Sequence, residues 1–242
     1  MPILILSDIH ANLTALEAVL ADAGSQEAVW CLGDLVGYGP DPNECVECIQ
    51  ELPDLVCLLG NHDAAVLGRL EIETFNQEAR QAVLWTRQTL TPQNLEFLGQ
   101  RIERSENDQV TLVHGSPREP VWEYLLDTRT ATLNFAYFET PFCFVGHSHL
   151  PLIYQLADGH RQADLFIPHA YQKLQMTPRA ILNPGSVGQP RDHDPRAAYA
   201  LFDPDTLTWE LRRVEYDIPR VQWRMLQIGL PARHMQRLSS GW

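Results

Sequence analysis

Three short apolar runs, separated by two segments with helix-start signals, constrain the fold of this chain more than any other feature. The runs cover residues 3–6, 28–32 and 55–59, and each has the length of a buried strand. Asn12 and Asp41 stand where the two intervening helices are expected to begin, because both residue types cap helix N-termini well. Strand, helix, strand, helix and strand within the first 59 residues indicate right-handed parallel crossovers, and therefore an α/β fold.

The rest of the chain continues with both kinds of element. A helical region is expected over residues 72–101, with a break where Thr91 and Pro92 begin a second helix. Another helix is expected over residues 217–228. Strands are expected over residues 109–113, 142–145, 151–156, 180–183, 197–202 and 207–216.

Two segments carry weaker signals. The polar stretch 158–178 is expected to form a solvated loop or hairpin, and the tail from about residue 229 is left unassigned. No internal repeat, low-complexity linker or composition shift divides the chain. We therefore predict a single domain over residues 1–242.

The composition is that of an ordered globular protein with an acidic balance. The chain has 242 residues, of which 45% are hydrophobic and 20% charged, and this is enough for a substantial core. A formal net charge of −13 argues against broad binding to a phosphate backbone, so no stable nucleic-acid complex is expected. It does not exclude a nucleotide substrate, because bound divalent cations reverse the local charge.

The cysteines and the N-terminal run favour a cytoplasmic protein without a membrane segment. The first residues lack a basic leader, and no apolar run has transmembrane length. The five cysteines are scattered, and Cys31, Cys57 and Cys143 lie inside apolar runs, which fits reduced thiols. Cys45 and Cys48 have no second pair, so buried thiols on a helix are favoured over a redox or zinc motif.

Five of the predicted strands end in residues that commonly bind metals. These residues are Asp8 with His10, Asp34, Asn61, His114, and His147 with His149. In an open α/β sheet, ligands bind at the carboxyl ends of the strands, so these side chains can converge there. A mixture of nitrogen and oxygen donors suits Mn, Fe, Co or Zn better than Ca or Mg alone.

These residues resemble the motif blocks of the calcineurin-like metallophosphoesterases. The blocks are Asp8-Ile9-His10, Gly33-Asp34, Gly60-Asn61-His62-Asp63, His114 and Gly146-His147-Ser148-His149. Their order and spacing both match, and they span residues 8–149. The stretch Asn183-Pro184-Gly185-Ser186 resembles a later block of the small prokaryotic members.

The resemblance implies a four-layer α/β/β/α sandwich of two mixed sheets flanked by helices, with a two-metal site between the sheet edges. Carried over to this sequence, one metal takes Asp8, His10 and His149, the other takes Asn61, His114 and His147, and Asp34 bridges both. The expected cofactors are two divalent ions, with Mn as first choice and Fe, Zn, Co and Ni as alternatives.

The expected chemistry is hydrolysis of a phosphoric ester. Two cations about 3.5–4 Å apart can activate a bridging water, so that a metal-bridged hydroxide attacks phosphorus. His62 stands beside the ligands without being one, and it is expected to protonate the leaving group as a general acid. Asp34 and His62 are thus the expected catalytic residues.

Several substrate classes stay open. A small phosphodiester is slightly favoured over a phosphomonoester, and a phosphatase acting on nucleotide polyphosphates or phosphoproteins is the alternative. A catalytically silent metal-binding scaffold, as in the retromer subunit of this superfamily, is less favoured because all seven ligand positions and His62 are present. The acidic balance also argues against a DNA nuclease. Whether the protein forms a homo-oligomer is left open.

The sequence departs from the phosphoprotein phosphatases after Asp34. Those relatives continue with an aspartate that supports the catalytic histidine and an arginine that binds phosphate, whereas Gly37 and Tyr38 stand here. The departure weakens a phosphoprotein phosphatase or a close diadenosine tetraphosphatase reading, and it leaves open what orients His62. Asp63 is adjacent to His62 and is one candidate.

Other residues have two readings each. Tyr38 is expected near the substrate, and Arg191 could bind a substrate phosphate or be an ordinary surface charge. Trp122 and Tyr124 could flank a substrate base or fill gaps in the core. The remaining histidines, His160, His169, His193 and His234, are expected to be structural or at the surface.

Overall fold

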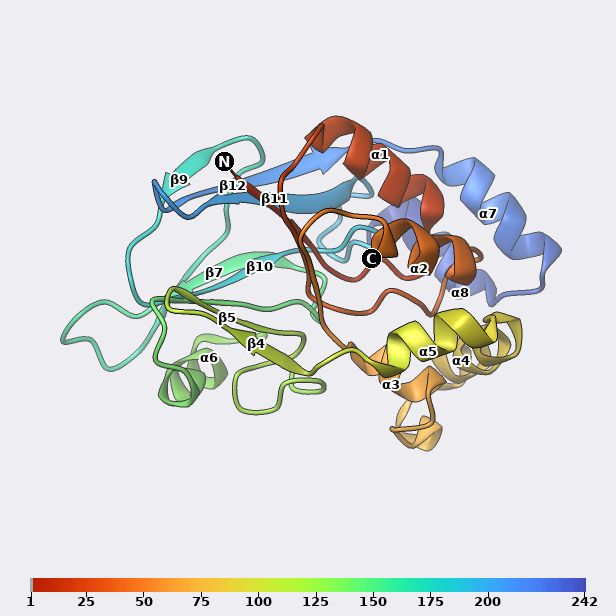
Figure 1. Cartoon of the computed structure of the whole chain (residues 1–242), viewed down its shortest axis with the longest axis horizontal. Helices are drawn as coiled ribbons and strands as arrows, with labels where there is room; N and C mark the ends of the chain where they lie inside the picture. Colours follow the sequence, from red (N-terminus) through yellow and green to blue (C-terminus); the bar gives the residue numbers. More distant parts are fainter. Residues whose placement is uncertain (1) are drawn as a thin grey trace.

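Two six-stranded sheets lie face to face in the computed structural model, which describes residues 2–242 (Figure 1). The first sheet has the strand order β3 (Leu55–Cys57), β2 (Val29–Cys31), β1 (Ile3–Leu6), β11 (Ala197–Asp203), β12 (Thr208–Val214) and β9 (Lys173–Gln175). The second has the order β4 (Arg104–Glu106), β5 (Val110–Val113), β6 (Phe142–Phe144), β10 (Ala180–Pro184), β7 (Pro151–Gln155) and β8 (Asp164–Phe166). Both sheets are mixed, with β1, β2 and β3 parallel in one and β5, β6 and β10 parallel in the other.

Helices cover the outer faces of both sheets, which confirms the predicted four-layer sandwich. The helices are α1 (Leu13–Ala23), α2 (Pro42–Gln50), α3 (Asn61–Val66), α4 (Gln77–Thr89), α5 (Pro92–Gly99), α6 (Thr128–Asn134), α7 (Ile218–Gln227) and α8 (Ala232–Ser240). Short 3₁₀ turns occur at Ile72–Thr74 and Phe135–Tyr137. In Figure 1, α6 lies below the second sheet and the other helices lie towards the right of the molecule.

The core has three apolar layers, as an α/β/β/α arrangement requires. One layer packs the first sheet against its helices, one fills the space between the sheets, and one lies between the second sheet and α6. Aromatic rings dominate the middle layer, where the Phe144 ring contacts those of Phe202 and Trp209 at centroid distances of 5.0 and 5.1 Å. The packing of these large buried rings fixes the position of one sheet relative to the other. It therefore keeps the ends of their strands close together.

Three predicted helix caps form as expected. The side chains of Asn12, Thr91 and Asp217 each accept a hydrogen bond from the backbone N–H three residues later. Asp41 does not cap its own helix, although α2 begins at Pro42 as predicted. Its carboxylate instead accepts hydrogen bonds from Arg224, at 2.7 and 2.9 Å, because α7 crosses the start of α2.

The structure corrects the reading of 158–178 as a loop or hairpin. Strand β8 pairs with β7 at the edge of the second sheet, whereas β9 pairs with β12 at the edge of the first. The segment therefore crosses from one sheet to the other and is not a hairpin. The tail that the sequence left unassigned contains α8. The outer face of this helix is charged, and its short apolar side is turned inward.

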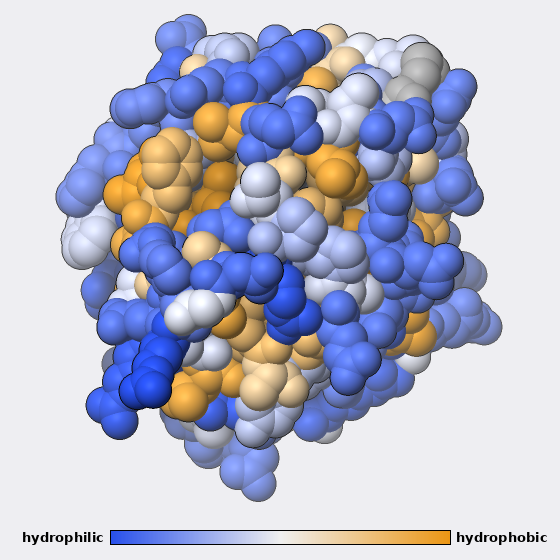
Figure 2. Space-filling model, turned by 90° about the vertical axis from the view of Figure 1, so that its left-hand side faces the viewer, coloured by the Kyte–Doolittle hydropathy of each residue, from blue (hydrophilic) through white to orange (hydrophobic). Residues whose placement is uncertain are grey.

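Apolar side chains reach the surface in patches on one side of the molecule (Figure 2). Figure 2 shows the side of the molecule that lies at the left in Figure 1, where apolar residues form patches interrupted by hydrophilic ones. Leu165, Phe166 and Ile167, in and after β8, are among the exposed large apolar residues. Within residues 2–242, no helix combines the length and apolar character needed to cross a membrane.

We expect Arg224→Gln to lower the free energy of unfolding by about 1–3 kcal/mol, because it removes charged hydrogen bonds and leaves Asp41 without its partner. Arg224 is only 24% exposed and also donates to Thr14 in α1. Urea denaturation would measure the change. The control is Arg220→Gln, an exposed arginine on the same helix, which should change stability by less than about 0.5 kcal/mol. Equal stability of the two variants would contradict the role assigned to this ion pair.

Candidate metal centre

The predicted ligand residues from five strands meet between the carboxyl ends of the two sheets. Asp8 and His10 follow β1, Asp34 follows β2, Asn61 follows β3, His114 follows β5, and His147 and His149 follow β6. All these side chains are buried. The convergence arises because β1, β2 and β3 run parallel, as do β5 and β6, and the two sets end at the same edge of the sandwich.

The backbone of the site is held in an uncommon conformation. Asp8, His10, Asp34, His147 and His149 all have positive φ angles, between 49° and 62°. Residues other than glycine rarely adopt this left-handed region, and each such residue costs about 1–3 kcal/mol. Strain of this kind persists only where surrounding contacts enforce it, and it concentrates at functional sites.

The donor atoms fall into three groups within which all atoms lie within 4.8 Å of one another. The groups are Asp8, His10 and His149; Asp34, His114 and His147; and His10, Asp34 and His62. In the first, the Nε2 atoms of His10 and His149 are 3.1 Å apart, and His149 Nε2 is 3.3 Å from Asp8 Oδ1. In the second, His114 Nε2 is 3.4 Å from Asp34 Oδ2. Asp34 thus belongs to two of the groups, at the point where they adjoin.

Two carboxylate oxygens in the centre have no hydrogen-bond partner within residues 2–242. They are Asp8 Oδ1 and Asp34 Oδ2, and both are fully buried. The other oxygen of each group is satisfied, since Asp8 Oδ2 accepts from Ser7 and from the His147 N–H, and Asp34 Oδ1 accepts from the His62 N–H. A buried anionic oxygen without a donor is costly, and a cation is the partner that these two oxygens fit.

The histidines are oriented as metal ligands usually are. Nδ1 of His10, His114 and His149 donates to the backbone carbonyls of Val36, Leu32 and Gln189, respectively, which leaves each Nε2 facing the carboxylates. His147 is reversed, because its Nε2 donates to the Trp122 carbonyl at 3.0 Å. Such partners fix the tautomer and the ring orientation of a ligating imidazole. The donor set therefore fits divalent cations.

The electrostatics of the site agree with this fit. Burial lowers the pKa of His10 and His149 well below the usual value, so both rings are neutral, as a metal ligand must be. Burial raises the pKa of Asp8 to about 6. Burial would lower the pKa of His114, but Asp34 beside it outweighs that effect and raises the pKa to about 9. The buried carboxylates thus leave the centre with an excess of negative charge, which the raised pKa of His114 reflects.

Asn61 is the first residue of α3, a short helix that the sequence did not indicate. Its Oδ1 lies 3.1 Å from His114 Nε2, so its amide oxygen faces the second donor group. Gly60 before it allows the close approach of two loops, because a Cβ there would lie 2.1 Å from Asp34 Oδ1. Asparagine and glycine at these positions are therefore both explained by the centre.

His62 is held by packing and not by a carboxylate. Its ring contacts those of Tyr38, His10 and Phe75 at centroid distances of 4.3, 4.9 and 5.1 Å, and its Nδ1 has no hydrogen-bond partner within residues 2–242. Gly37 is the reason the ring fits, because a Cβ there would lie 2.6 Å from His62 Nδ1. In the structure the His62 ring occupies the space that Gly37, with no side chain, leaves free.

Asp63 does not orient His62. Its carboxylate turns towards the backbone and accepts hydrogen bonds from the N–H groups of Asp34, Val36 and Gly60. One side chain thereby ties the loop after β2 to the loop after β3. Asp63 is a structural residue of the centre, and the sequence indicated only that it was adjacent.

Tyr38 and Arg191 lie beside the donor groups, near where the sequence placed a substrate contact. The Tyr38 ring is buried between His10 and His234, at centroid distances of 4.6 and 4.5 Å. Arg191 Nη2 donates to the Tyr38 hydroxyl at 3.5 Å. Arg191 is therefore not an isolated surface charge. His234 is structural, as expected, but it is buried directly behind the centre.

Three aromatic side chains form the wall on the side of His147. The Tyr124 ring stacks on the His147 ring with centroids 3.7 Å apart, and Trp122 contacts both His147 and Phe75. Trp122 and Tyr124 are 38% and 42% exposed, so neither fills a gap in the core. The sequence analysis missed Phe75, since a single aromatic between two helices carries no distinguishing pattern.

The remaining histidines and cysteines stand apart from the centre. His160 and His169 are exposed, and the exposed His193 ring stacks on Trp242. All five cysteines are free, and burial raises the pKa of Cys45 and Cys48. The reading of these two as thiols on one helix, without a redox or zinc role, agrees with their position in α2.

Comparison with known proteins places this geometry in a family. The family model of the calcineurin-like phosphoesterase superfamily domain matches residues 1–207. The solved structure of a metallophosphoesterase from Sphaerobacter thermophilus is 47% identical in sequence, with a TM-score of 0.92 over 100% of this chain and 99% of that chain. The uncharacterized protein MJ0912 from Methanocaldococcus jannaschii is 37% identical over 247 residues, which cover 99% of this chain and 98% of that protein.

A shorter similarity links the chain to an enzyme of known substrate. The symmetrical bis(5'-nucleosyl)-tetraphosphatase of Pectobacterium carotovorum is 35% identical over 68 residues, but these cover only 26% of this chain and 24% of that protein. The longer matches decide the family. This protein belongs to the calcineurin-like phosphoesterase superfamily.

Proposed function

We propose that this protein is a binuclear metal-dependent phosphoesterase that hydrolyses a small phosphodiester or phosphomonoester. The observation that supports it best is that two groups of donor atoms, one with Asp8 and one with Asp34, each contain a buried carboxylate oxygen without a hydrogen-bond partner within residues 2–242. The Asp34 carboxylate also lies 3.6 Å from His10 Nε2, which belongs to the Asp8 group. Membership of a phosphoesterase superfamily supports the reaction class.

In this proposal the donor groups hold two divalent cations. Asp8, His10 and His149 would hold the first and Asn61, His114 and His147 the second. Asp34 could contribute to both, because its Oδ2 lies 3.6 Å from His10 Nε2 and 3.4 Å from His114 Nε2. When bound, such a pair supplies an activated water and neutralises the negative charge of the phosphate oxygens. Mn is the first choice, with Fe, Zn, Co and Ni as alternatives, because all accept imidazole and carboxylate ligands.

The role that we assign to His62 is to protonate the leaving oxygen. Its ring shares a donor group with His10 and Asp34, and it belongs neither to the group of Asp8 and His149 nor to that of His114 and His147. Burial lowers the pKa of His62 to about 4, and the negative charge of a bound phosphate would raise it again. Contacts with Tyr38 and Phe75 keep the ring in one orientation, as a positioned acid requires.

The proposed substrate is small and nucleotide-like. Trp122 and Tyr124 present exposed aromatic faces beside His147, on which a base could stack. Tyr38 and Arg191 are the proposed contacts to the substrate on the other side. The short similarity to a bis(5'-nucleosyl)-tetraphosphatase favours the second candidate, a phosphatase acting on nucleotide polyphosphates. Gly37 and Tyr38 weaken the phosphoprotein alternative, because they replace an aspartate and an arginine.

The test of the proposed function is a comparison of esters and metals. Protein supplied with Mn should contain two metal ions per chain and hydrolyse both p-nitrophenyl phosphate and bis(p-nitrophenyl) phosphate, with some preference for the diester. Asp34→Asn should lower kcat/KM by about a hundredfold or more and reduce the metal content, because Asp34 belongs to two donor groups. Steady-state kinetics and elemental analysis by mass spectrometry measure the two effects.

The control for this test is Asp54→Asn, which removes an exposed carboxylate and should leave both quantities unchanged. Cleavage of the monoester alone would end the preference for diesters. Two bound metals without turnover of any activated ester would favour the silent scaffold.

His62→Ala should lower kcat most for substrates with poor leaving groups, by about a hundredfold or more for an alkyl phosphate, because only those need the proton. The metal content should stay near that of the wild type. A series of aryl and alkyl phosphates graded by leaving-group pKa measures the dependence. Equal losses across the series would rule out His62 as the acid, and loss of metal would make it a ligand.

Gly37→Ala should reproduce the His62→Ala phenotype, because the added methyl group would displace the imidazole from its place. The two changes should be strongly non-additive when combined, since both act through one ring. Gly159→Ala is the matched control. Gly159 has a similar positive φ of 77° but no atom within 4 Å of an added Cβ, so it reports backbone strain alone. Additive losses in the double variant would show that Gly37 acts by another route.

A further inference from the structure

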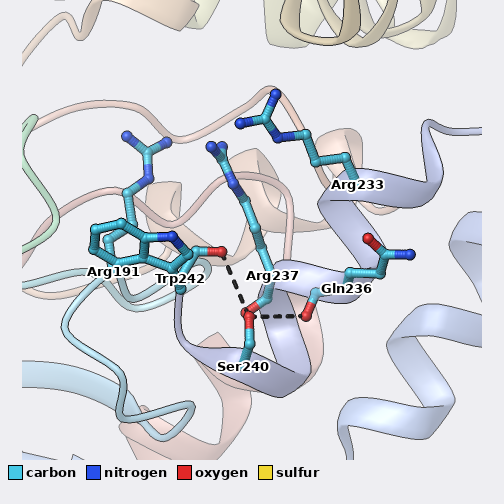
Figure 3. Close-up of a pocket in the computed structure, with 6 residues that line it drawn as sticks. All are labelled: Arg191, Arg233, Gln236, Arg237, Ser240 and Trp242. Atoms are coloured by element: carbon cyan, nitrogen blue, oxygen red, sulfur yellow. Dashed lines mark hydrogen bonds between the residues drawn. The ribbon is translucent and has the colours of Figure 1, made fainter.

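Three arginines gather around a pocket beside the candidate metal centre. The pocket has a volume of about 440 Å³ and is lined by Arg191, Arg233, Gln236, Arg237, Ser240 and Trp242. Arg191 comes from the loop between β10 and β11, and the others come from α8 or follow it. Figure 3 shows the three guanidinium groups extending in the same direction. The chain has a net charge of −13, so three arginines at one pocket concentrate positive charge against the acidic balance of the whole protein.

The positive charge of this pocket is poorly compensated. Arg191 Nε is buried without a hydrogen-bond partner within residues 2–242, and Arg191 Nη2 donates only to neutral acceptors, the Tyr38 hydroxyl and Gln189 Oε1. Arg233 has only a loose contact with Glu78, with Nη1 and Oε1 3.9 Å apart. Burial, and then the nearby charge of Arg191, lower the pKa of Arg237. Three like charges beside one loosely held carboxylate favour an anionic ligand.

Arg191 links the pocket to the centre through side-chain contacts. This side chain lines the pocket and also donates to the Tyr38 hydroxyl, and the Tyr38 ring contacts His10 and His62. A ligand in the pocket would therefore lie next to a substrate whose reacting phosphate occupies the centre. The pocket wall also carries neutral hydrogen-bond donors, because Gln236 and Ser240 both line it.

Much of this pocket lies outside the residues that the family model matches. The family model matches residues 1–207, whereas Arg233 and Arg237 belong to α8. Helix α8 is anchored from within, since Leu238 and His234 are buried and His234 packs on Tyr38. The arginines are thus carried on a fixed helix and not on a free tail.

We propose that Arg191, Arg233 and Arg237 form an anion-binding site for a second phosphate group of the substrate. Guanidinium groups bind phosphate through paired N–H donors, and three of them facing one space suit a group with more than one negative charge. The inference rests on the proposed function and narrows it. The favoured substrate is then a phosphoester with a second phosphate at a distance, such as a nucleoside polyphosphate, and not a simple monoester.

The kinetic test uses substrates that differ in the number of phosphates. Wild type, Arg233→Gln/Arg237→Gln and the control Arg220→Gln are compared on adenosine mono-, di-, tri- and tetraphosphate and on p-nitrophenyl phosphate. For the longer adenosine phosphates, the double variant should raise KM by about tenfold or more relative to the change seen with p-nitrophenyl phosphate. Arg220→Gln removes an exposed charge that does not line the pocket. It should leave the ratio of KM for the adenosine phosphates to KM for p-nitrophenyl phosphate unchanged.

The binding test is independent of turnover. Inorganic triphosphate is titrated into the metal-free full-length protein, with isothermal titration calorimetry as the readout. It should bind wild type and Arg220→Gln alike, and bind the double variant about tenfold more weakly or worse, because only the double variant lacks the pocket cations.

The two tests separate the failure of the pocket from the failure of the proposed function. If the double variant hydrolyses esters with the same KM ratios as wild type and binds triphosphate equally well, the proposed anion-binding site is wrong. Triphosphate binding that depends on Arg233 and Arg237, without turnover of any ester, would overturn the proposed function and support the anion site.

Discussion

The burial of two carboxylates, Asp8 and Asp34, is the constraint on which the rest of the structure depends. Each has one oxygen satisfied by hydrogen bonds and one without a partner within residues 2–242. Removing an anion from water costs several kcal/mol unless a charge compensates it. Most of the surrounding imidazoles are neutral, since burial lowers the pKa of His10, His147 and His149. Part of the folding free energy is thus used to bury carboxylate oxygens that fit cations, so cation binding at this centre is expected to add to stability.

The loops that carry the centre are held by bonds that cross between strand ends. The Asp63 carboxylate collects three backbone N–H groups, and the His147 N–H donates to Asp8 across the two sheets. The Asp8 carbonyl accepts from the Gly188 N–H, which brings in the loop after β10. These bonds offset the left-handed backbone at the ligand positions, and they fix donor atoms from distant segments within a few ångströms.

His62 shows how one position can be supported in two physical ways. A carboxylate beside a histidine raises its pKa and fixes one tautomer, whereas aromatic packing fixes the ring plane and leaves the pKa low. Here Gly37 makes room for the ring, and Tyr38 and Phe75 enclose it. Tyr38 is in turn supported by His234 of α8, so the C-terminal helix contributes to both the centre and the arginine pocket.

The sequence by itself determined the strand ends and the types of donor, because apolar runs and the residues after them are local features. It predicted the sandwich, the caps at Asn12, Thr91 and Asp217, and the set of residues that meet at the centre. Only the tertiary structure decided how His62 is held, why Asp41 pairs with Arg224, and where α8 brings Arg233 and Arg237. Those outcomes depend on contacts between segments far apart in the chain. Such contacts leave no periodic signal, since their geometry exists only once the two sheets have packed.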